Sequence, residues 1–135
     1  MPEASTTARC RWRLPAEPAV LPLVRESVSR MMGPAAADDL ERVRLAVTEA
    51  CANVVRHAYP GDRGLLDVGV CLRPETVSVE VRDSGIGVCD EREPPGERGG
   101  GLGLPLIDML ADRVEITPQR PGTSVRMTFD LQGTR

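Results

Sequence analysis

The stretch Thr48–Tyr59 reads TEACANVVRHAY, and it closes the longest helical pattern in the chain. Apolar residues recur at helical spacing from Asp38 to about His57, and Pro60-Gly61 ends the pattern. Asp38 and Glu41 have the spacing of an N-cap and N3 pair, so we expect a capping box at the helix start. The predicted apolar face comprises Leu40, Val43, Val47, Ala50, Cys51, Val54 and Ala58.

A narrow polar stripe interrupts this apolar helix. At 100° per residue, Arg42, Glu49, Asn53 and Arg56 fall within about 60° of one another. The carboxylate of Glu49 and the amide of Asn53, one turn apart, can supply a general base and an oxygen ligand for Mg²⁺. A solvated helix face explains such a pair when it is taken alone. His57 follows one turn later, where a cation or cap at the helix end is favoured over catalysis.

The elements on either side of this helix predict the fold class. In order they are a strand at 9–14, a helix from 18–21 to 32, the helix above, strands at 65–72 and 77–82, a loop at 83–101, a helix at 102–111, and strands at 113–117 and 123–131. The inward side chains of the middle strands would be Leu66, Val68, Val70, Leu72, Val77, Val79 and Val81. This order predicts an α+β two-layer sandwich, with a mixed, mostly antiparallel sheet and helices on one face.

Composition narrows the range of functions. The length of 135 residues suits one domain. A net charge of −3 does not require a basic surface patch, which argues against direct nucleic-acid binding. The single Trp, Tyr and Phe exclude a stacking platform for single strands. All 17 basic residues are Arg, which excludes Schiff-base and P-loop lysine chemistry.

Cysteine usage and hydropathy point to an intracellular protein. The four cysteines (10, 51, 71 and 89) form no CxxC pair and are accompanied by one histidine, which argues against a zinc site. All four fall in apolar or alternating runs, so we expect them to be small buried hydrophobes. The chain shows neither a signal peptide nor an 18-residue apolar run, so the cytoplasm is the expected location, without membrane contact.

Two glycine-containing clusters follow the predicted strands. Asp83-Ser84-Gly85-Ile86-Gly87 comes directly after a strand, where a carboxylate can accept a hydrogen bond from an exocyclic amine and glycines allow close approach. An ordinary Asp-Ser-Gly turn is the alternative. The second cluster, 99–104 (GGGLGL), precedes a helix and can cradle an anion on free backbone N–H groups. A flexible linker is the alternative for that run of glycines.

Taken together and in this order, these motifs are specific for one fold. The pattern E-A-x-x-N-x-x-x-H-A (49–58), D-S-G-I-G (83–87), G-L-G-L (101–104) and Gly122-Thr123 resembles the GHKL ATP-binding fold. Within that superfamily the chain looks most like the stand-alone anti-sigma factor serine/threonine kinases of bacterial partner switching. The resemblance implies an ATP-binding domain at 9–131 between tails at 1–8 and 132–135, with a mobile ATP lid at about 88–101.

The resemblance also implies residue roles. Glu49 would be the general base, Asn53 would bind Mg²⁺, and Asp83 would contact the adenine amino group, assisted by Thr123. Gly85 and Gly87 would shape the adenine pocket, and the lid would meet the phosphates. The lid departs from the family pattern, because two glycines separate Arg98 from Gly101 where many relatives have one residue. The implied ATP-binding set is Asn53, Asp83, Gly85, Gly87, Arg98, Gly101, Leu102, Gly103 and Thr123.

The implied activity is ATP- and Mg²⁺-dependent phosphorylation of a serine on a small anti-anti-sigma factor, with capture of an RNA polymerase sigma factor as the second role. A homodimer is possible in such a family. A partner-binding switch that uses nucleotide without phosphorylating anything is the main alternative. A plain structural α+β domain with coincident motifs is the third.

Overall fold

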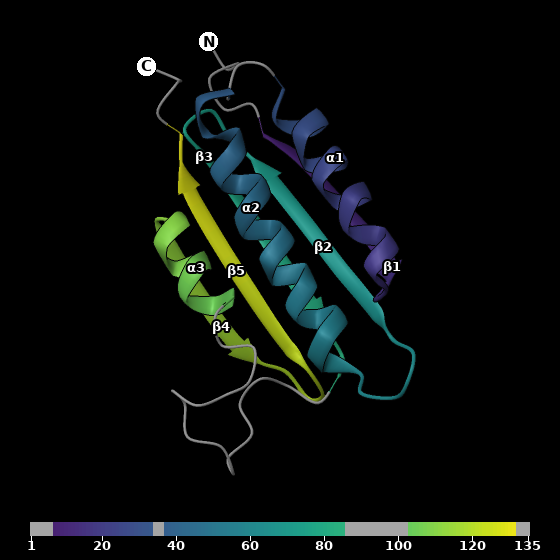
Figure 1. Ribbon diagram of the computed structural model, residues 1–135. Coiled ribbons are helices and arrows are strands. Elements are labelled where there is room, and N and C mark those ends of the chain that lie inside the picture. Colours follow the sequence, from purple (N-terminus) through teal and green to yellow (C-terminus); the bar gives the residue numbers. More distant parts are fainter. Residues whose placement is uncertain (1–6, 34–36, 86–102, 132–135) are drawn as a thin grey trace.

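The computed structural model describes residues 7–33, 37–85 and 103–131. Its strands are β1 (Ala8–Pro15), β2 (Leu65–Leu72), β3 (Thr76–Asp83), β4 (Arg113–Pro118) and β5 (Thr123–Asp130), and its α-helices are α1 (Leu21–Met32), α2 (Ala37–Asn53) and α3 (Gly103–Leu110). One sheet has the order β1-β2-β3-β5-β4, and every pairing in the described part is antiparallel. All three α-helices lie on one face of it (Figure 1). The predicted two-layer α+β sandwich is confirmed, and the sheet is antiparallel rather than mixed.

The first helix begins and ends at the predicted bounds. A 3-10 turn at Pro18–Val20 leads into α1, with Pro22 in the first turn, where its missing N–H costs no hydrogen bond. Gly33 ends the helix with a φ of 69°, a left-handed conformation that favours glycine. The side chains of Val24, Val28 and Met32 face the core.

The predicted capping box of the second helix is wrong. The α2 helix begins at Ala37, so Asp38 lies inside the first turn instead of preceding it. The buried carboxylate there is Asp39, which forms an ion pair with Arg42 at 3.1 Å. The two aspartates in the first turn favour the helix through its dipole.

The same helix changes geometry at its other end. After Asn53 the chain continues as a π-helical turn, Val54–Ala58, where a regular α-helix was predicted to run to about His57. Such turns are uncommon and occur frequently at functional sites. Here the turn directly follows the predicted metal ligand.

The core is mainly aliphatic, as the few aromatic residues of the sequence predict, and Phe129 is its largest fully buried side chain. Buried side chains of β2, β3 and β5 meet those of the helices, and Leu72 is the one member of the predicted inward set that is only half-buried. The cysteine prediction holds for Cys51 and is wrong for Cys10 and Cys71, and Cys89 lies outside the described residues. Cys10 lies in the exposed first half of the edge strand β1. Cys71 alternates with the core-facing Val70 and Leu72, so it projects toward the face of the sheet opposite α1, α2 and α3.

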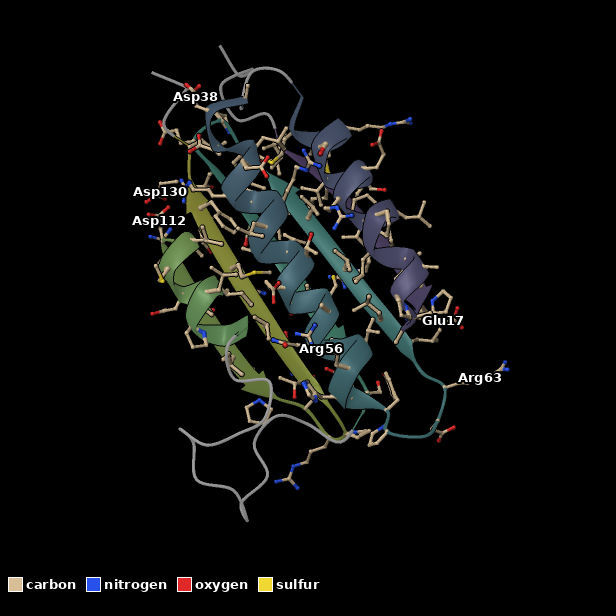
Figure 2. All side chains as sticks on the ribbon, in the orientation of Figure 1. Glu17, Asp38, Arg56, Arg63, Asp112 and Asp130 are labelled. Carbon is tan, nitrogen blue, oxygen red and sulfur yellow. The ribbon has the colours of Figure 1, made fainter. Side chains whose placement is uncertain are left out.

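Arg42 ties the first half of α2 to the elements beside it. Besides Asp39, its guanidinium donates to the carbonyl oxygens of Leu110 (2.8 Å) and Asp130 (2.7 Å) and to the Asp112 carboxylate (3.3 Å). It also lies over the Phe129 ring, 5.6 Å from its centroid. Figure 2 shows Asp112 and Asp130 at the end of α2 that lies away from Arg56. Arg42 is therefore a structural residue, not a member of a functional stripe with Glu49 and Asn53.

Hydropathy adds one negative finding. Within the described residues, no helix has both the length and the apolar character needed to cross a membrane.

Candidate functional site

The candidate site is built from the C-terminal half of α2, the end of β3 and the start of β5, and Ala58 in the π-helical turn after α2 packs against Gly85 after β3. Asp83 is the last residue of β3, and Thr123 is the first residue of β5. The two are register partners, so the antiparallel pairing places the predicted adenine-binding residues side by side. Thr123 is only 2% exposed. These two predicted residues are thus brought together by the sheet itself.

The Asp83 carboxylate is held by backbone donors. Its Oδ1 accepts a hydrogen bond from the Gly85 N–H at 2.8 Å, and the Thr123 backbone N–H also donates to this carboxyl group. Burial raises the pKa of Asp83, and these two hydrogen bonds oppose the rise because they favour the charged form. The result is a partly buried, fixed carboxylate that can accept a hydrogen bond from a bound amine.

Two glycines are required by close backbone packing at this point. A Cβ at Gly85 would overlap the carbonyl group of Ala58, at the end of the π-helical turn. A Cβ at Gly122 would overlap the Asp83 carbonyl group, and Gly122 also has a φ of 103°. Gly85, which was predicted to shape the adenine pocket, therefore allows the loop after β3 to pack against the end of the π-helical turn.

The base and metal candidates lie one turn apart on the second helix. The Arg56 Nη2 atom donates to Asn53 Oδ1 at 3.1 Å and lies 3.9 Å from Glu49 Oε1. Arg56 projects from the C-terminal end of this helical segment (Figure 2). The Glu49 side chain is 28% exposed, which leaves its carboxylate reachable by a substrate. Glu49, Asn53 and Arg56, three of the four residues of the predicted stripe, therefore interact with one another.

The donor set suits Mg²⁺. The amide oxygen of Asn53 and the carboxylate oxygens of Glu49 are hard ligands, and Mg²⁺ in phosphoryl-transfer sites takes one or two protein oxygens together with phosphate and water. Among the described residues no cluster of three His, Cys, Asp or Glu side chains could hold a metal without such additional ligands. The residues present therefore fit a metal that is shared with a bound phosphate.

Part of the predicted site cannot be placed. Gly87, Arg98, Gly101 and Leu102, and the predicted lid at about 88–101, lie outside the described residues. Gly103 is the first residue of α3.

One residue at this site was not assigned a role from sequence. The Tyr59 hydroxyl donates to the Leu65 carbonyl oxygen at 2.7 Å and accepts from the Ser84 N–H at 2.8 Å. Local periodicity cannot reveal either contact, because both join segments that are separate in the sequence. The only signal was the presence of a tyrosine at the end of the TEACANVVRHAY helix.

Comparisons with known proteins show the family of the chain. The model of the histidine kinase-like ATPase domain family matches residues 14–129. The serine-protein kinase RsbW of Bacillus mycoides is 32% identical over 126 residues, covering 84% of this chain and 78% of that protein. The protein of the same name from Staphylococcus aureus is 32% identical over 132 residues, covering 86% and 82%.

Solved structures show the same fold. The structure of the RsbU and RsbW domains of a Mycobacterium tuberculosis protein matches with a TM-score of 0.71 and 22% identity, covering 92% of this chain. This chain spans about a third (32%) of that longer chain. The histidine kinase domain of a blue-light activated histidine kinase from Erythrobacter litoralis matches with a TM-score of 0.60 and 22% identity, covering 86% of this chain and 61% of that one.

Proposed function

The chain belongs to the histidine kinase-like ATPase domain family and, within it, to the anti-sigma serine-protein kinases, and from this premise we propose that Glu49, Asn53 and Asp83 carry its kinase reaction. It is a nucleotide-binding serine/threonine protein kinase. The observation that supports these residues most strongly is the half-buried Glu49–Asn53–Arg56 cluster, which lies one π-helical turn before the contact with the Asp83 loop.

Glu49 acts as the general base in this proposal. Its carboxylate accepts the proton of a serine hydroxyl as the oxygen attacks the γ-phosphorus of ATP, and the bond to the leaving ADP oxygen breaks. The guanidinium of Arg56 lies 3.9 Å from this carboxylate. The half-exposed position lets a protein substrate present its serine to the base.

Asp83 and Thr123 recognise the base of the nucleotide. The carboxylate of Asp83 accepts a hydrogen bond from the adenine amino group, while Gly85 keeps its orientation fixed through the 2.8 Å bond. A guanine carries a carbonyl oxygen at that position, which would meet the carboxylate as two acceptors without a donor. This pairing makes ATP the expected nucleotide.

Asn53 would hold Mg²⁺ through its amide oxygen. When bound, the metal neutralises charge on the phosphate oxygens. In the structure that amide oxygen accepts from Arg56, and because an amide oxygen has two lone pairs, this hydrogen bond would not prevent it from also binding a metal. Arg56 and Arg98 are both candidates to bind a phosphate oxygen.

The partners follow from the family. The serine-protein kinase family of anti-sigma factors acts in partner switching with sigma factors and anti-anti-sigma factors. We propose that the substrate of this chain is a serine on an anti-anti-sigma factor, and that the chain captures a sigma factor while that antagonist is phosphorylated.

The Asp83→Asn substitution tests the adenine assignment. Loss of a charged acceptor is expected to weaken ATP binding roughly 10- to 100-fold, measured by isothermal titration calorimetry. Asp108→Asn, an exposed change on α3, serves as the control and is expected to leave the affinity unchanged. Equal ATP affinity in wild type and Asp83→Asn would remove Asp83 from the site.

Asp83→Asn is also expected to change the way in which the stability of the nucleotide-free protein depends on pH. Because burial raises the pKa of Asp83, protonation of this side chain stabilises the folded protein. This stabilisation is fully present below the pKa of the unfolded state and is lost as pH rises through the pKa of the folded state. Asparagine does not titrate, so the stability of Asp83→Asn relative to wild type is expected to increase from acid to neutral pH. Urea unfolding at several pH values measures this difference, and a difference that stays constant with pH would contradict it.

A further inference from the structure

The hydroxyl group of Tyr59 occupies the point where the β2–β3 ladder ends. The last register pair described there is Leu66 with Asp83, so Leu65 and Ser84 are next in line. Instead of pairing directly, the Leu65 carbonyl oxygen accepts from the Tyr59 hydroxyl (2.7 Å), and that hydroxyl accepts from the Ser84 N–H (2.8 Å). A side-chain oxygen thus bridges the two strands, and both backbone groups stay satisfied while the chain turns away from the sheet.

The neighbouring residues reinforce this bridge. The Tyr59 ring lies over Gly64, where an added Cβ would overlap the ring, and the Ala58 carbonyl group packs against Gly85. Ala58 and Tyr59, which follow the second helix, therefore contact Gly85 and Ser84, which follow β3. Gly85 is in turn the donor to Asp83 Oδ1.

We propose that Tyr59 is a positioning residue for nucleotide recognition: its hydroxyl fixes the Ser84–Gly85 backbone and thereby aims the Asp83 carboxylate at the adenine amino group. The proposal rests on the adenine role of Asp83 proposed above. Tyr59 touches neither nucleotide nor substrate. It acts through the loop, and it fixes the distance between the adenine loop and the helix that carries Glu49 and Asn53.

Removal of the hydroxyl is expected to affect nucleotide recognition more than catalysis. In Tyr59→Phe the ring is retained, but the Ser84 N–H and the Leu65 carbonyl lose their shared partner. The KM for ATP is expected to rise about tenfold with kcat nearly unchanged, because the loss falls on binding and not on proton transfer. Preference for ATP over GTP is expected to fall as well, since a loosened Asp83 discriminates less between an amino and a carbonyl group.

A second variant keeps the test valid if Tyr59→Phe does not fold. Gly64→Ala retains the hydroxyl but pushes the ring from its place, so it is expected to produce the same rise in KM. Ser84→Ala is the matched control, because it changes an exposed side chain in the same loop and keeps the N–H that Tyr59 binds. Unchanged KM and unchanged preference for ATP in a folded Tyr59→Phe or Gly64→Ala variant would overturn the proposal, and so would a loss confined to kcat.

Amide hydrogen exchange separates this inference from the proposed function. In the nucleotide-free protein, the Ser84 and Gly85 amides are expected to exchange at least about tenfold faster in Tyr59→Phe than in wild type, whether or not ATP is the true ligand. If exchange is faster in Tyr59→Phe but the wild-type protein binds no ATP, the positioning contact is real and the proposed adenine role is refuted. Equal exchange rates would show that the hydroxyl does not fix the loop, and the positioning role would be wrong.

Discussion

Glu49→Gln is expected to slow phosphoryl transfer from ATP to serine by about 10²- to 10⁴-fold, the usual contribution of a general base. The substitution keeps the size of the side chain and one oxygen but removes the group that accepts the proton. Binding of ATP should change by less than about threefold, since the base faces the attacking hydroxyl and not the nucleotide. Transfer of the labelled γ-phosphate in single-turnover conditions measures the rate, and calorimetry measures the affinity.

The control for this variant lies on the same helix. Glu41→Gln removes one negative charge from a side chain that is 84% exposed and more than one turn away, so both rate and affinity should match wild type. Phosphoryl transfer that persists at the wild-type rate in Glu49→Gln would contradict the base assignment. Loss of ATP binding in the same variant would instead place Glu49 in the nucleotide pocket.

Arg42→Met is expected to lower the free energy of unfolding by about 2–4 kcal/mol. Its guanidinium contacts two carbonyl oxygens and two carboxylates, and the Asp39 side chain is only 3% exposed. Methionine replaces the apolar stem but leaves Asp39 buried without this cation. Urea denaturation, followed by far-ultraviolet circular dichroism, measures the loss.

An exposed ion pair provides the comparison for that loss. Arg30→Met breaks the pair with Glu26 on α1, whose side chains are 80% and 63% exposed, and is expected to cost less than about 0.5 kcal/mol. Equal losses in the two variants would mean that the contacts of Arg42 contribute no more than a solvated pair does.

Most of the fold was predictable because its signals are local. Alternation of Val and Leu placed β2 within its observed bounds, and Pro22 and Gly33 placed the ends of α1. The relative placement of Glu49 and Asn53 follows from helical periodicity alone. The Asp83–Thr123 pairing needed the resemblance, because no local pattern reports which strands are neighbours.

The errors have physical causes that a single sequence does not display. Cys10 and Cys71 follow apolar alternation, but edge position and the face of the sheet opposite α1, α2 and α3 decide their exposure. Arg42 shares a helical stripe with Glu49, yet its partners Leu110 and Asp130 lie 68 and 88 residues away in sequence. Tyr59 likewise acquires its role only when β2 and β3 meet at its hydroxyl.

The most direct test of the whole account is a calorimetric titration of ATP with and without Mg²⁺, on wild type and on Asn53→Ala. The account predicts that wild type binds ATP more tightly with Mg²⁺ and that this dependence disappears in Asn53→Ala, where the amide oxygen is gone. Failure of the wild-type protein to bind ATP at millimolar concentration, or a Mg²⁺ dependence that survives in Asn53→Ala, would contradict it.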